Sequence, residues 1–376
     1  MKYIDLEAQY KSIKYSLDKT LLNTAKGGKY ILGKQVVKLE EKVAALIQTK
    51  YAVGLNSGTD ALFLSLKAMA IGHGDEVITT PFSFVATAEV IATAGAKPVF
   101  VDINPRTFNI DPAKIKRAIT KRSKVIMPVH LYGQMADMDA IIKIAKKHKL
   151  FVIEDAAQAI GATQKYQVSS SKYLVRKAGS AGNIGCFSFF PTKNLGAYGD
   201  GGMITTNYER LAEKIRMLRN HGSKKKYQHD FLGFSSRLDE LQAAILLAKL
   251  PHLKKWNKAR QKIAAYYTKN LAGIEALTTP FIEAGDEHIF HQYTIRTKER
   301  DKLRAFLSTR DIPTSIHYPL PLHLQPALKY LNYKLGDFPE AELAAKEVLS
   351  LPLYPELKIS DQNKIINAVI SFYRNQ

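Results

Sequence analysis

Residues 185–202 have the sequence Gly-Cys-Phe-Ser-Phe-Phe-Pro-Thr-Lys-Asn-Leu-Gly-Ala-Tyr-Gly-Asp-Gly-Gly, an apolar strand followed by a glycine-rich loop. Such an apolar strand is expected to be buried, and the glycines let the following backbone turn sharply and lie close to a ligand. Lys193 lies between these two parts. Partial burial would favour its neutral amine, the nucleophile that a Schiff base needs. The simpler alternative is a lysine that extends from the strand end into solvent.

Short apolar strands alternate with helical patterns before this stretch. The predicted strands are 51–55, 77–80, 98–102, 124–131 and 150–153, the last one ending on Glu154 and Asp155. This alternation predicts an α/β fold with a mainly parallel sheet that helices cover on both faces. Ligands of such folds bind at the carboxyl ends of strands. Asn56, Asp155 and Lys193 all fall at predicted strand ends.

The sequence pattern in the second half of the chain predicts a second domain. A long helical pattern begins at Arg237 and is interrupted by Pro251, as expected for a connector between domains. We therefore expect a large domain at 1–250 and a smaller α+β domain at 251–376. Residues 165–178 show no clear period, so we expect a surface loop there.

Composition narrows the class of protein. The chain has 376 residues, of which 46% are hydrophobic, enough for a substantial core. No apolar run approaches the roughly 18 residues of a membrane span, and the N-terminus lacks the apolar core of a signal peptide. The single cysteine, Cys186, excludes an internal disulfide. These features predict a cytoplasmic protein without membrane contact.

The formal net charge of +21 suits nucleic acid, an anionic small substrate, or simply a basic surface in water. The lysines are spread along helical patterns, and the sequence has neither zinc-finger spacing nor an RNP-like strand. We therefore expect a solvated basic surface, with an anionic substrate as a second interpretation and nucleic acid as a third. We expect no metal site.

The loop at 56–60, Asn-Ser-Gly-Thr-Asp, follows a predicted strand and opens a predicted helix. Free backbone N–H groups and the helix dipole make such a place suitable for an anion. Ser57, Thr59 and Asp60 suit helix capping equally well, and for the loop alone capping is the simpler interpretation.

An anion site, an acidic strand end and a lysine have a joint explanation in pyridoxal 5′-phosphate (PLP). The aldehyde of PLP needs an amine, its ring nitrogen needs a carboxylate, and its phosphate needs N–H groups and hydroxyls. Lys193 offers the amine and Asp155 the carboxylate. The loop with Gly58 and Thr59 offers the phosphate site, with Ser188 as a further donor, and Phe84 offers an aromatic partner for the ring. Each feature alone is unspecific, but their order and combination favour this cofactor.

The sequence resembles the sugar aminotransferases of the DegT/DnrJ/EryC1/StrS family, which have the aspartate aminotransferase-like fold (fold type I). The resemblance covers nearly the whole chain, and its motifs are 56–62, 74–78, 128–133, 154–158, 187–202, 237–244 and 317–319. It implies a large domain with a mainly parallel sheet of the seven-stranded type, a smaller C-terminal domain, and a homodimer with active sites at the subunit interface.

The family's motifs imply roles for individual residues. Lys193 would bind PLP covalently, Asp155 would pair with the pyridine nitrogen, and Gln158 would lie near the ring hydroxyl. Phe84 would stack on the ring, and the phosphate would be held by Gly58, Thr59 and Ser188. Some relatives are dehydratases with histidine in place of this lysine, so the lysine favours transamination.

The implied reaction transfers an amino group from L-glutamate to PLP, giving pyridoxamine phosphate (PMP), and then to a nucleotide-linked keto-sugar. The product would feed a polysaccharide or a small glycosylated metabolite. The motifs favour C3 over C4 amination. The alternatives are another fold-type-I enzyme, a non-catalytic PLP-binding regulator of the same fold, and a nucleic-acid binder.

Three residues are candidates for the substrate site. Tyr318 and His323 resemble positions that border the sugar, and Lys224 lies in a lysine cluster that suits a diphosphate. A structural or solvated role is the alternative for each. The chain also departs from the family at Ser235, where an asparagine commonly reaches the phosphate from the partner subunit. Serine is shorter, so this contact would be lost or bridged by water. The 165–178 stretch also looks longer than usual.

Overall fold

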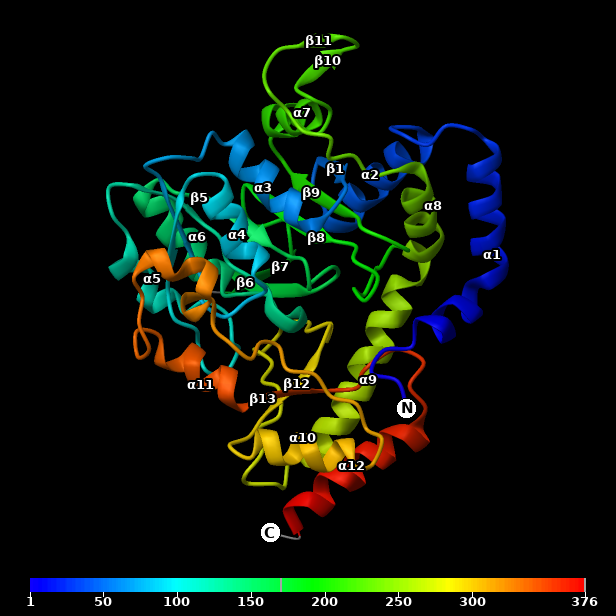
Figure 1. The fold of residues 1–376 in the computed structure, drawn as a ribbon, viewed down its shortest axis with the longest axis vertical. Coiled ribbons are helices and arrows are strands. Elements are labelled where there is room, and N and C mark those ends of the chain that lie inside the picture. Colours follow the sequence, from blue (N-terminus) through cyan, green and yellow to red (C-terminus); the bar gives the residue numbers. More distant parts are fainter. Residues whose placement is uncertain (170, 375–376) are drawn as a thin grey trace.

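The structure, a computed structural model, describes residues 1–169 and 171–374 and is built on a seven-stranded sheet (Figure 1). The strand order is β1-β9-β8-β5-β4-β2-β3. All strands run parallel except β9, which is antiparallel to its neighbours β1 and β8. The predicted α/β fold with a mainly parallel sheet is therefore confirmed. The strands are β1 Tyr51–Leu55, β2 Glu76–Thr79, β3 Lys97–Phe100, β4 Ser123–Ile126, β5 Phe151–Asp155, β8 Ile184–Ser188 and β9 Gly202–Thr206.

Helices cover both faces of this sheet. The helices of the first 250 residues are α1 Leu6–Lys26, α2 Lys34–Ile47, α3 Gly58–Ala68, α4 Ala86–Thr93, α5 Pro112–Ala118, α6 Met138–His148, α7 Glu209–Leu218 and α8 Glu240–Lys249. Their ends follow local rules: Asp137 caps α6 by accepting a hydrogen bond from Ala140 N, at 3.1 Å. α5 begins with Pro112 after its cap Asp111, whose side chain accepts a hydrogen bond from Ala113 N.

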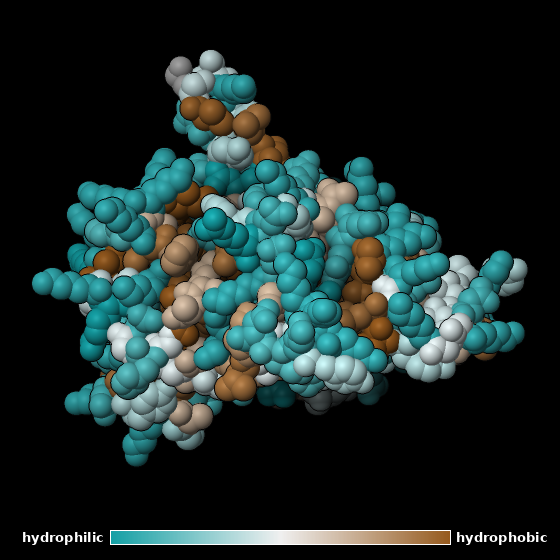
Figure 2. Space-filling model, turned by 90° about the horizontal axis from the view of Figure 1, so that it is seen from above, coloured by the Kyte–Doolittle hydropathy of each residue, from teal (hydrophilic) through white to brown (hydrophobic). Residues whose placement is uncertain are grey.

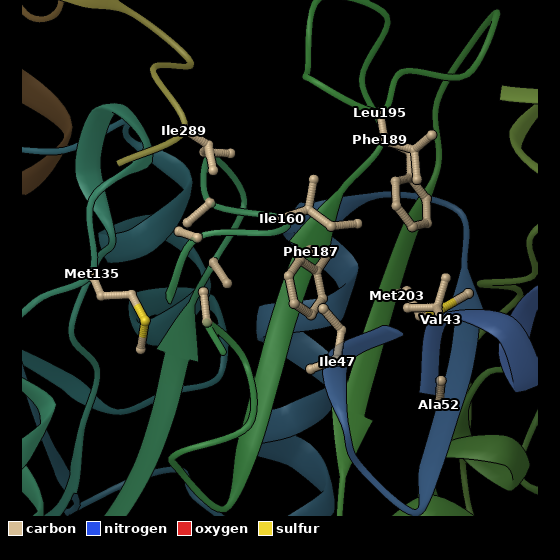
Figure 3. Close-up of a cluster of buried hydrophobic side chains, with 14 of the residues drawn as sticks. Val43, Ile47, Ala52, Met135, Ile160, Phe187, Phe189, Leu195, Met203 and Ile289 are labelled. Atoms are coloured by element: carbon tan, nitrogen blue, oxygen red, sulfur yellow. The ribbon is translucent and has the colours of Figure 1, made fainter. Parts of the chain in front are cut away.

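β8 shows how a buried strand separates two cores. Successive side chains of a strand point to opposite faces of the sheet. Phe187 packs in a cluster with side chains of α2 and β9, among them Ile47 and Met203 (Figure 3). Its neighbour Cys186 packs on the other face with side chains of α3 and α7. Burial on both faces explains why this strand is apolar throughout.

The rest of the chain surrounds a third core. A 3-10 turn at Leu250–His252 separates α8 from α9, so the predicted interruption at Pro251 is confirmed. The elements that follow are α9 Leu253–Leu271, β12 Tyr293–Arg296, α10 Arg300–Ser308, 3-10 helices at Leu322–Leu324 and Pro326–Leu331, α11 Pro339–Glu347, β13 Val348–Leu351 and α12 Ile359–Arg374. Side chains of α9, β12, α10, β13 and α12 form this core.

Part of the C-terminal region packs on the large sheet instead. Leu322, Leu328 and Phe338 belong to a cluster with Phe82 and Phe100. Leu253 and Ile289 also pack in the cluster that contains Phe187. Residues beyond 251 thus contribute to several cores, and the division into domains at 250 stays a prediction.

The prediction of a surface loop at 165–178 is wrong for most of that stretch. Strands β6 Thr163–Ser169 and β7 Lys172–Lys177 form an antiparallel hairpin. Its side chains are mostly exposed, so burial imposes no alternating pattern on the sequence. In Figure 2 the hairpin protrudes from the body and carries hydrophobic side chains. Ser170, inside the predicted stretch, lies outside the described residues.

A second hairpin projects from the top of the molecule in Figure 1. It consists of β10 Ser223–Lys225 and β11 Gln228–His229. The strand predicted at 124–131 is shorter than expected, because β4 ends at Ile126 and a 3-10 turn occupies Leu131–Gly133. Within residues 1–169 and 171–374, no helix combines the length and apolarity needed to cross a membrane.

Candidate active site

A cavity of about 470 Å³ lies at the carboxyl ends of β5 and β8, where the C-terminal region meets the large sheet. The cavity brings together eight residues that the sequence predicts for the site: Gly58, Thr59, Phe84, Asp155, Gln158, Ser188, Lys193 and Tyr318. They come from positions far apart in the chain, and the fold places them around one space.

Lys193 lies in the turn after β8, where its backbone N–H donates to Phe190 O at 2.8 Å. Burial lowers the pKa of Lys193 to about 8, and the charge of Asp155 partly opposes this shift. A pKa near 8 leaves a substantial neutral fraction at neutral pH, unlike an exposed lysine. This setting suits a nucleophilic amine better than a solvated side chain.

Asp155 ends β5 and faces the same cavity. Its Oδ2 accepts a hydrogen bond from the Thr87 hydroxyl at 2.8 Å, and its Oδ1 accepts from Ala157 N at 3.2 Å. The Thr87 hydroxyl also lies 2.9 Å from Ser83 Oγ. Burial raises the pKa of Asp155, although these bonds and the charge of Lys193 oppose the shift. Thr87 and Ser83 thus orient the carboxylate, and no sequence motif identified them.

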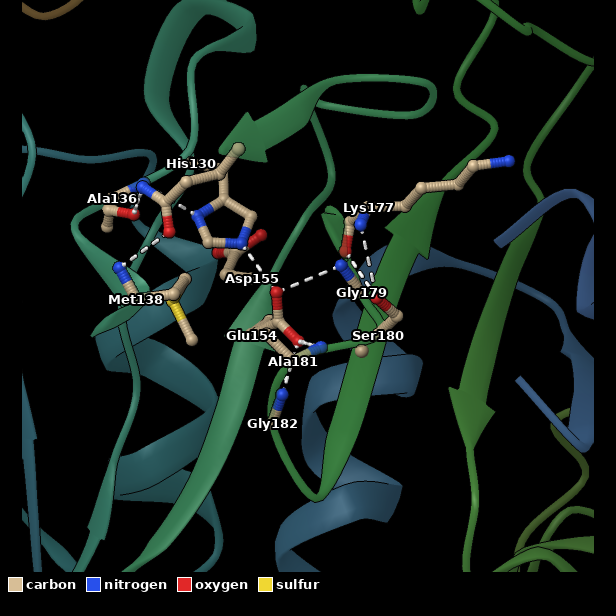
Figure 4. A network of polar contacts seen from close by, with 12 residues as sticks. His130, Ala136, Met138, Glu154, Asp155, Lys177, Gly179, Ser180, Ala181 and Gly182 are labelled. Atoms are coloured by element: carbon tan, nitrogen blue, oxygen red, sulfur yellow. Dashed lines mark hydrogen bonds and ion pairs between the residues drawn. The ribbon is translucent and has the colours of Figure 1, made fainter. Parts of the chain in front are cut away.

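The preceding residue, Glu154, anchors the end of β5 in a buried network (Figure 4). Its Oε2 lies 2.8 Å from His130 Nε2, and both side chains are fully buried. His130 Nδ1 accepts from Ala136 N, so Nε2 carries the proton and donates to Glu154. The Glu154 carboxylate also accepts from the backbone N–H groups of Gly179, Ala181 and Gly182. The carboxylate therefore ties β5 to the loop before β8, and so fixes Asp155 relative to Lys193.

The start of α3 lies beside Ser188 at the edge of the cavity. Ser57 caps α3 by accepting from Asp60 N at 3.0 Å, so the capping interpretation holds for this serine. A Cβ on Gly58 would lie 2.6 Å from Ser188 Cβ, and a Cβ on Gly202 would lie 2.1 Å from Ser57 O. Only glycine fits at these two positions. The N-terminus of α3 is thereby held against the end of β8, where it favours an anion.

Gln158, Tyr318 and Phe84 form another wall of the cavity. Gln158 Oε1 accepts from Tyr132 N at 2.8 Å, and its Nε2 donates to the Tyr318 hydroxyl at 3.2 Å. The rings of Phe84 and Tyr318 lie 6.2 Å apart. Phe84 is 55% exposed, so its ring is available to a flat partner. With an amine, a carboxylate, an anion site and this aromatic ring, the residues present fit PLP.

Three predicted residues do not line the cavity. His323 is buried and its Nε2 lies 3.0 Å from Glu342 Oε1, so the geometry favours its structural alternative over a place beside the sugar. Lys224 lies on the exposed β10, and Ser235 Oγ accepts from Arg237 Nη2 at 3.2 Å. Roles for Lys224 and Ser235 that involve a partner subunit stay predictions.

The cavity also contains residues to which the sequence analysis gave no role, notably His291, Gln292, His317 and Asp200. Burial lowers the pKa of His317 to about 4 and that of His291 well below its usual range. Both imidazoles are therefore neutral at physiological pH. His317 belongs to a recognised motif, whereas nothing in the sequence pattern distinguishes His291 from a core histidine.

Comparisons with known proteins identify the family of the chain. The model of the DegT/DnrJ/EryC1/StrS aminotransferase family matches residues 11–370. A protein of Geobacillus stearothermophilus named pleiotropic regulatory protein is 54% identical, over 99% of this chain and 98% of its own. A UDP-N-acetyl-3-dehydro-alpha-D-glucosamine 3-aminotransferase of Acidithiobacillus ferrooxidans is 46% identical, over 94% of this chain and 93% of its own.

A solved structure matches almost the whole fold. The crystal structure of S. venezuelae DesV in complex with a ketimine intermediate superposes with a TM-score of 0.94 at 41% identity, covering 99% of this chain and 98% of DesV. Family model, relatives and solved structure all match nearly the whole chain. The chain therefore belongs to the DegT/DnrJ/EryC1/StrS aminotransferase family.

Proposed function

We propose that this chain uses PLP to transfer the amino group of L-glutamate to C3 of a nucleotide-linked keto-sugar. One observation carries the proposal: the amine of Lys193 and the carboxylate of Asp155 face one cavity beside the anion site at the start of α3. C3 is favoured because the relative from Acidithiobacillus ferrooxidans is named a 3-aminotransferase.

Each residue would have a defined task. Lys193 would hold the cofactor, then take a proton from the substrate carbon and return it to a neighbouring atom. Asp155, oriented by Thr87, would keep the ring nitrogen protonated. Gly58, Thr59 and Ser188 would bind the phosphate, and Phe84 would cover the ring. When bound, PLP supplies the electron sink that makes this proton transfer feasible.

The partner subunit belongs to the proposal. The hairpin of β10 and β11 projects from the body and carries Lys224, and Leu232 just beyond it is 95% exposed. We propose a homodimer in which this hairpin packs on a second copy of the chain. Lys224 of the partner subunit would then approach the diphosphate of the sugar nucleotide, and Ser235 of the partner subunit would approach the phosphate of PLP.

A mass-spectrometric assay tests the reaction. The PLP-loaded protein is offered L-glutamate with UDP- and dTDP-linked sugars that carry a keto group at C3 or C4. We expect amino-sugar product from a 3-keto substrate, and none from the Lys193→Ala variant. Product from 4-keto sugars alone would move the assignment to C4, and turnover by Lys193→Ala at the wild-type rate would refute the role of Lys193.

A second function has one observation in its favour, because the 54% identical relative is named a regulatory protein. A non-catalytic regulator would bind PLP and sugar nucleotide without turnover. The retained pair of Lys193 and Asp155 favours the enzyme. Binding of PLP without product from any sugar of the panel would reverse this preference.

A further inference from the structure

His291 lies in the wall of the cavity, in the segment that leads into β12. Its side chain is 5% exposed, and its Nδ1 lies 3.3 Å from the side-chain oxygen of Asn194. Asn194 directly follows Lys193 in the chain. The imidazole is thereby attached to the loop that carries the proposed nucleophile.

Hydrogen bonds to two backbone carbonyls fix which nitrogen of His291 holds the proton. The amide nitrogen of Asn194 donates to Ile289 O at 3.2 Å and to Asn257 Oδ1 at 2.8 Å. The amide nitrogen of Asn257 donates to Ile160 O at 3.1 Å. Since carbonyl oxygens only accept, both amide orientations are determined, and the Asn194 oxygen faces the imidazole. Nδ1 of His291 must therefore be the donor.

The remaining nitrogen, Nε2, then has a free lone pair. Among the described residues no group makes a hydrogen bond to Nε2, and it is not one of the fully enclosed polar atoms that lack a partner. It therefore faces the open space of the cavity. Burial, with the charges of Lys193 and Arg260 nearby, lowers the pKa of His291 and keeps the ring neutral.

We propose that His291 is a positioning residue for Lys193: its Nε2 accepts a hydrogen bond from the ammonium that Lys193 becomes during turnover, a contact that the resting protein does not make. The neutral amine takes a proton from the substrate carbon and becomes an ammonium. One N–H group of the ammonium donates a hydrogen bond to Nε2. A second N–H group gives its proton to the atom next to the substrate carbon. Asn194 keeps Nε2 free for this bond. The inference rests on the proposed function and assigns a residue to the same site.

Two variants distinguish the role of Nδ1 of His291 from the role of Nε2. In His291→Asn the new amide nitrogen takes the place of Nδ1 and can still donate to Asn194, but the acceptor at Nε2 is lost. In His291→Gln the longer side chain places an amide oxygen near Nε2 and restores an acceptor there. His73→Asn, at an exposed position, serves as the matched control.

Single-turnover kinetics of the PLP-loaded enzyme with L-glutamate, followed by visible absorbance, give the first readout. We expect His291→Asn to slow this step up to about 100-fold, with little change in glutamate affinity and a larger isotope effect for glutamate deuterated at Cα. His291→Gln should recover most of the rate. A wild-type rate in His291→Asn, or equal losses in both variants, would overturn the proposal.

The second readout needs no cofactor. Nitrogen-15 NMR of histidine-labelled, cofactor-free protein should show a proton on Nδ1 and a bare Nε2 for the signal that disappears in His291→Asn. The reverse tautomer would overturn the assignment. If the wild type does not react with L-glutamate, the proposed donor is wrong, whereas the tautomer measurement still tests whether Nε2 of His291 is available as an acceptor.

Discussion

At the scale of single residues, the site depends on one desolvated amine and its charged neighbour. Burial lowers the pKa of Lys193, and Asp155 limits that shift by favouring the ammonium. Asp155 ends β5, and Lys193 lies in the turn after β8, the adjacent parallel strand, so the sheet brings both to the same edge. The chemistry of the lysine is thus determined by backbone geometry.

The first prediction concerns the pH at which cofactor-free protein captures PLP. Only the neutral amine reacts, so the capture rate should rise with pH through a midpoint of about 8. Asp155→Asn removes a negative charge that raises the pKa of Lys193, so its midpoint should be lower. Stopped-flow absorbance measures both. A midpoint near the usual value for lysine would mean that the amine is solvated.

The second prediction concerns Glu154, which is fully buried with His130 and three backbone N–H groups. Glu154→Ala leaves these donors without an acceptor, so the free energy of unfolding should fall by roughly 3–5 kcal/mol. Urea denaturation measures the loss. Glu213→Ala, at an exposed position on α7, should change little. Equal stability of the two variants would contradict the importance of this network.

At the scale of elements, β8, β9 and the start of α3 pack so closely that only glycine fits at two positions between them. Gly202 begins β9 against the loop that opens α3, and Gly58 opens α3 against the last residue of β8. Because these backbones are in contact, the anion site can move only if the sheet moves with it.

The third prediction follows from that contact. Gly202→Ala would place a methyl carbon 2.1 Å from Ser57 O, so the strand or the loop must shift. We expect a loss of about 1–3 kcal/mol in stability and weaker binding of PLP, measured by thermal denaturation and by titration. Gly273→Ala is the control, because a Cβ there meets nothing within 4 Å. If Gly202→Ala bound PLP with unchanged affinity, the close contact at Gly202 would not be needed to hold the proposed anion site in place.

At the scale of the whole molecule, the hairpin of β10 and β11 and the residues just after it present apolar side chains at the surface. Leu232 and Tyr227 are 95% and 83% exposed, a large exposure for apolar side chains so close together. A second copy of the chain is the partner proposed above.

The fourth prediction tests that partner. Leu232→Asp should raise the dimer dissociation constant about 100-fold, because two leucines per dimer would lose a buried environment. Sedimentation velocity over a range of concentrations measures the change. Leu335→Asp, on another exposed leucine, should leave the dimer intact. A monomeric wild type would remove the basis for sharing sites between subunits.

The sheet was predictable from the sequence because buried strands are apolar and alternate with helices. The cavity residues on strand ends and on the 56–60 loop were predictable for the same reason, since the ends of parallel strands meet at one edge. The hairpin of β6 and β7 was missed because exposed strands need no hydrophobic pattern. Thr87 and His291 were missed because their importance arises from contacts across 68 and 97 positions. A local sequence pattern carries no information about contacts between residues so far apart in the chain.

The position of β9 has a consequence for synthesis of the chain. β1 pairs only with β9 in the large sheet, and about 150 residues separate them. At the usual pace of translation the ribosome needs roughly 7–30 s to make that interval. During this time the nascent β1 lacks the strand with which it pairs in the finished sheet. Chaperones that shield newly emerging segments are therefore expected to matter more for this chain than for one whose neighbouring strands follow each other directly.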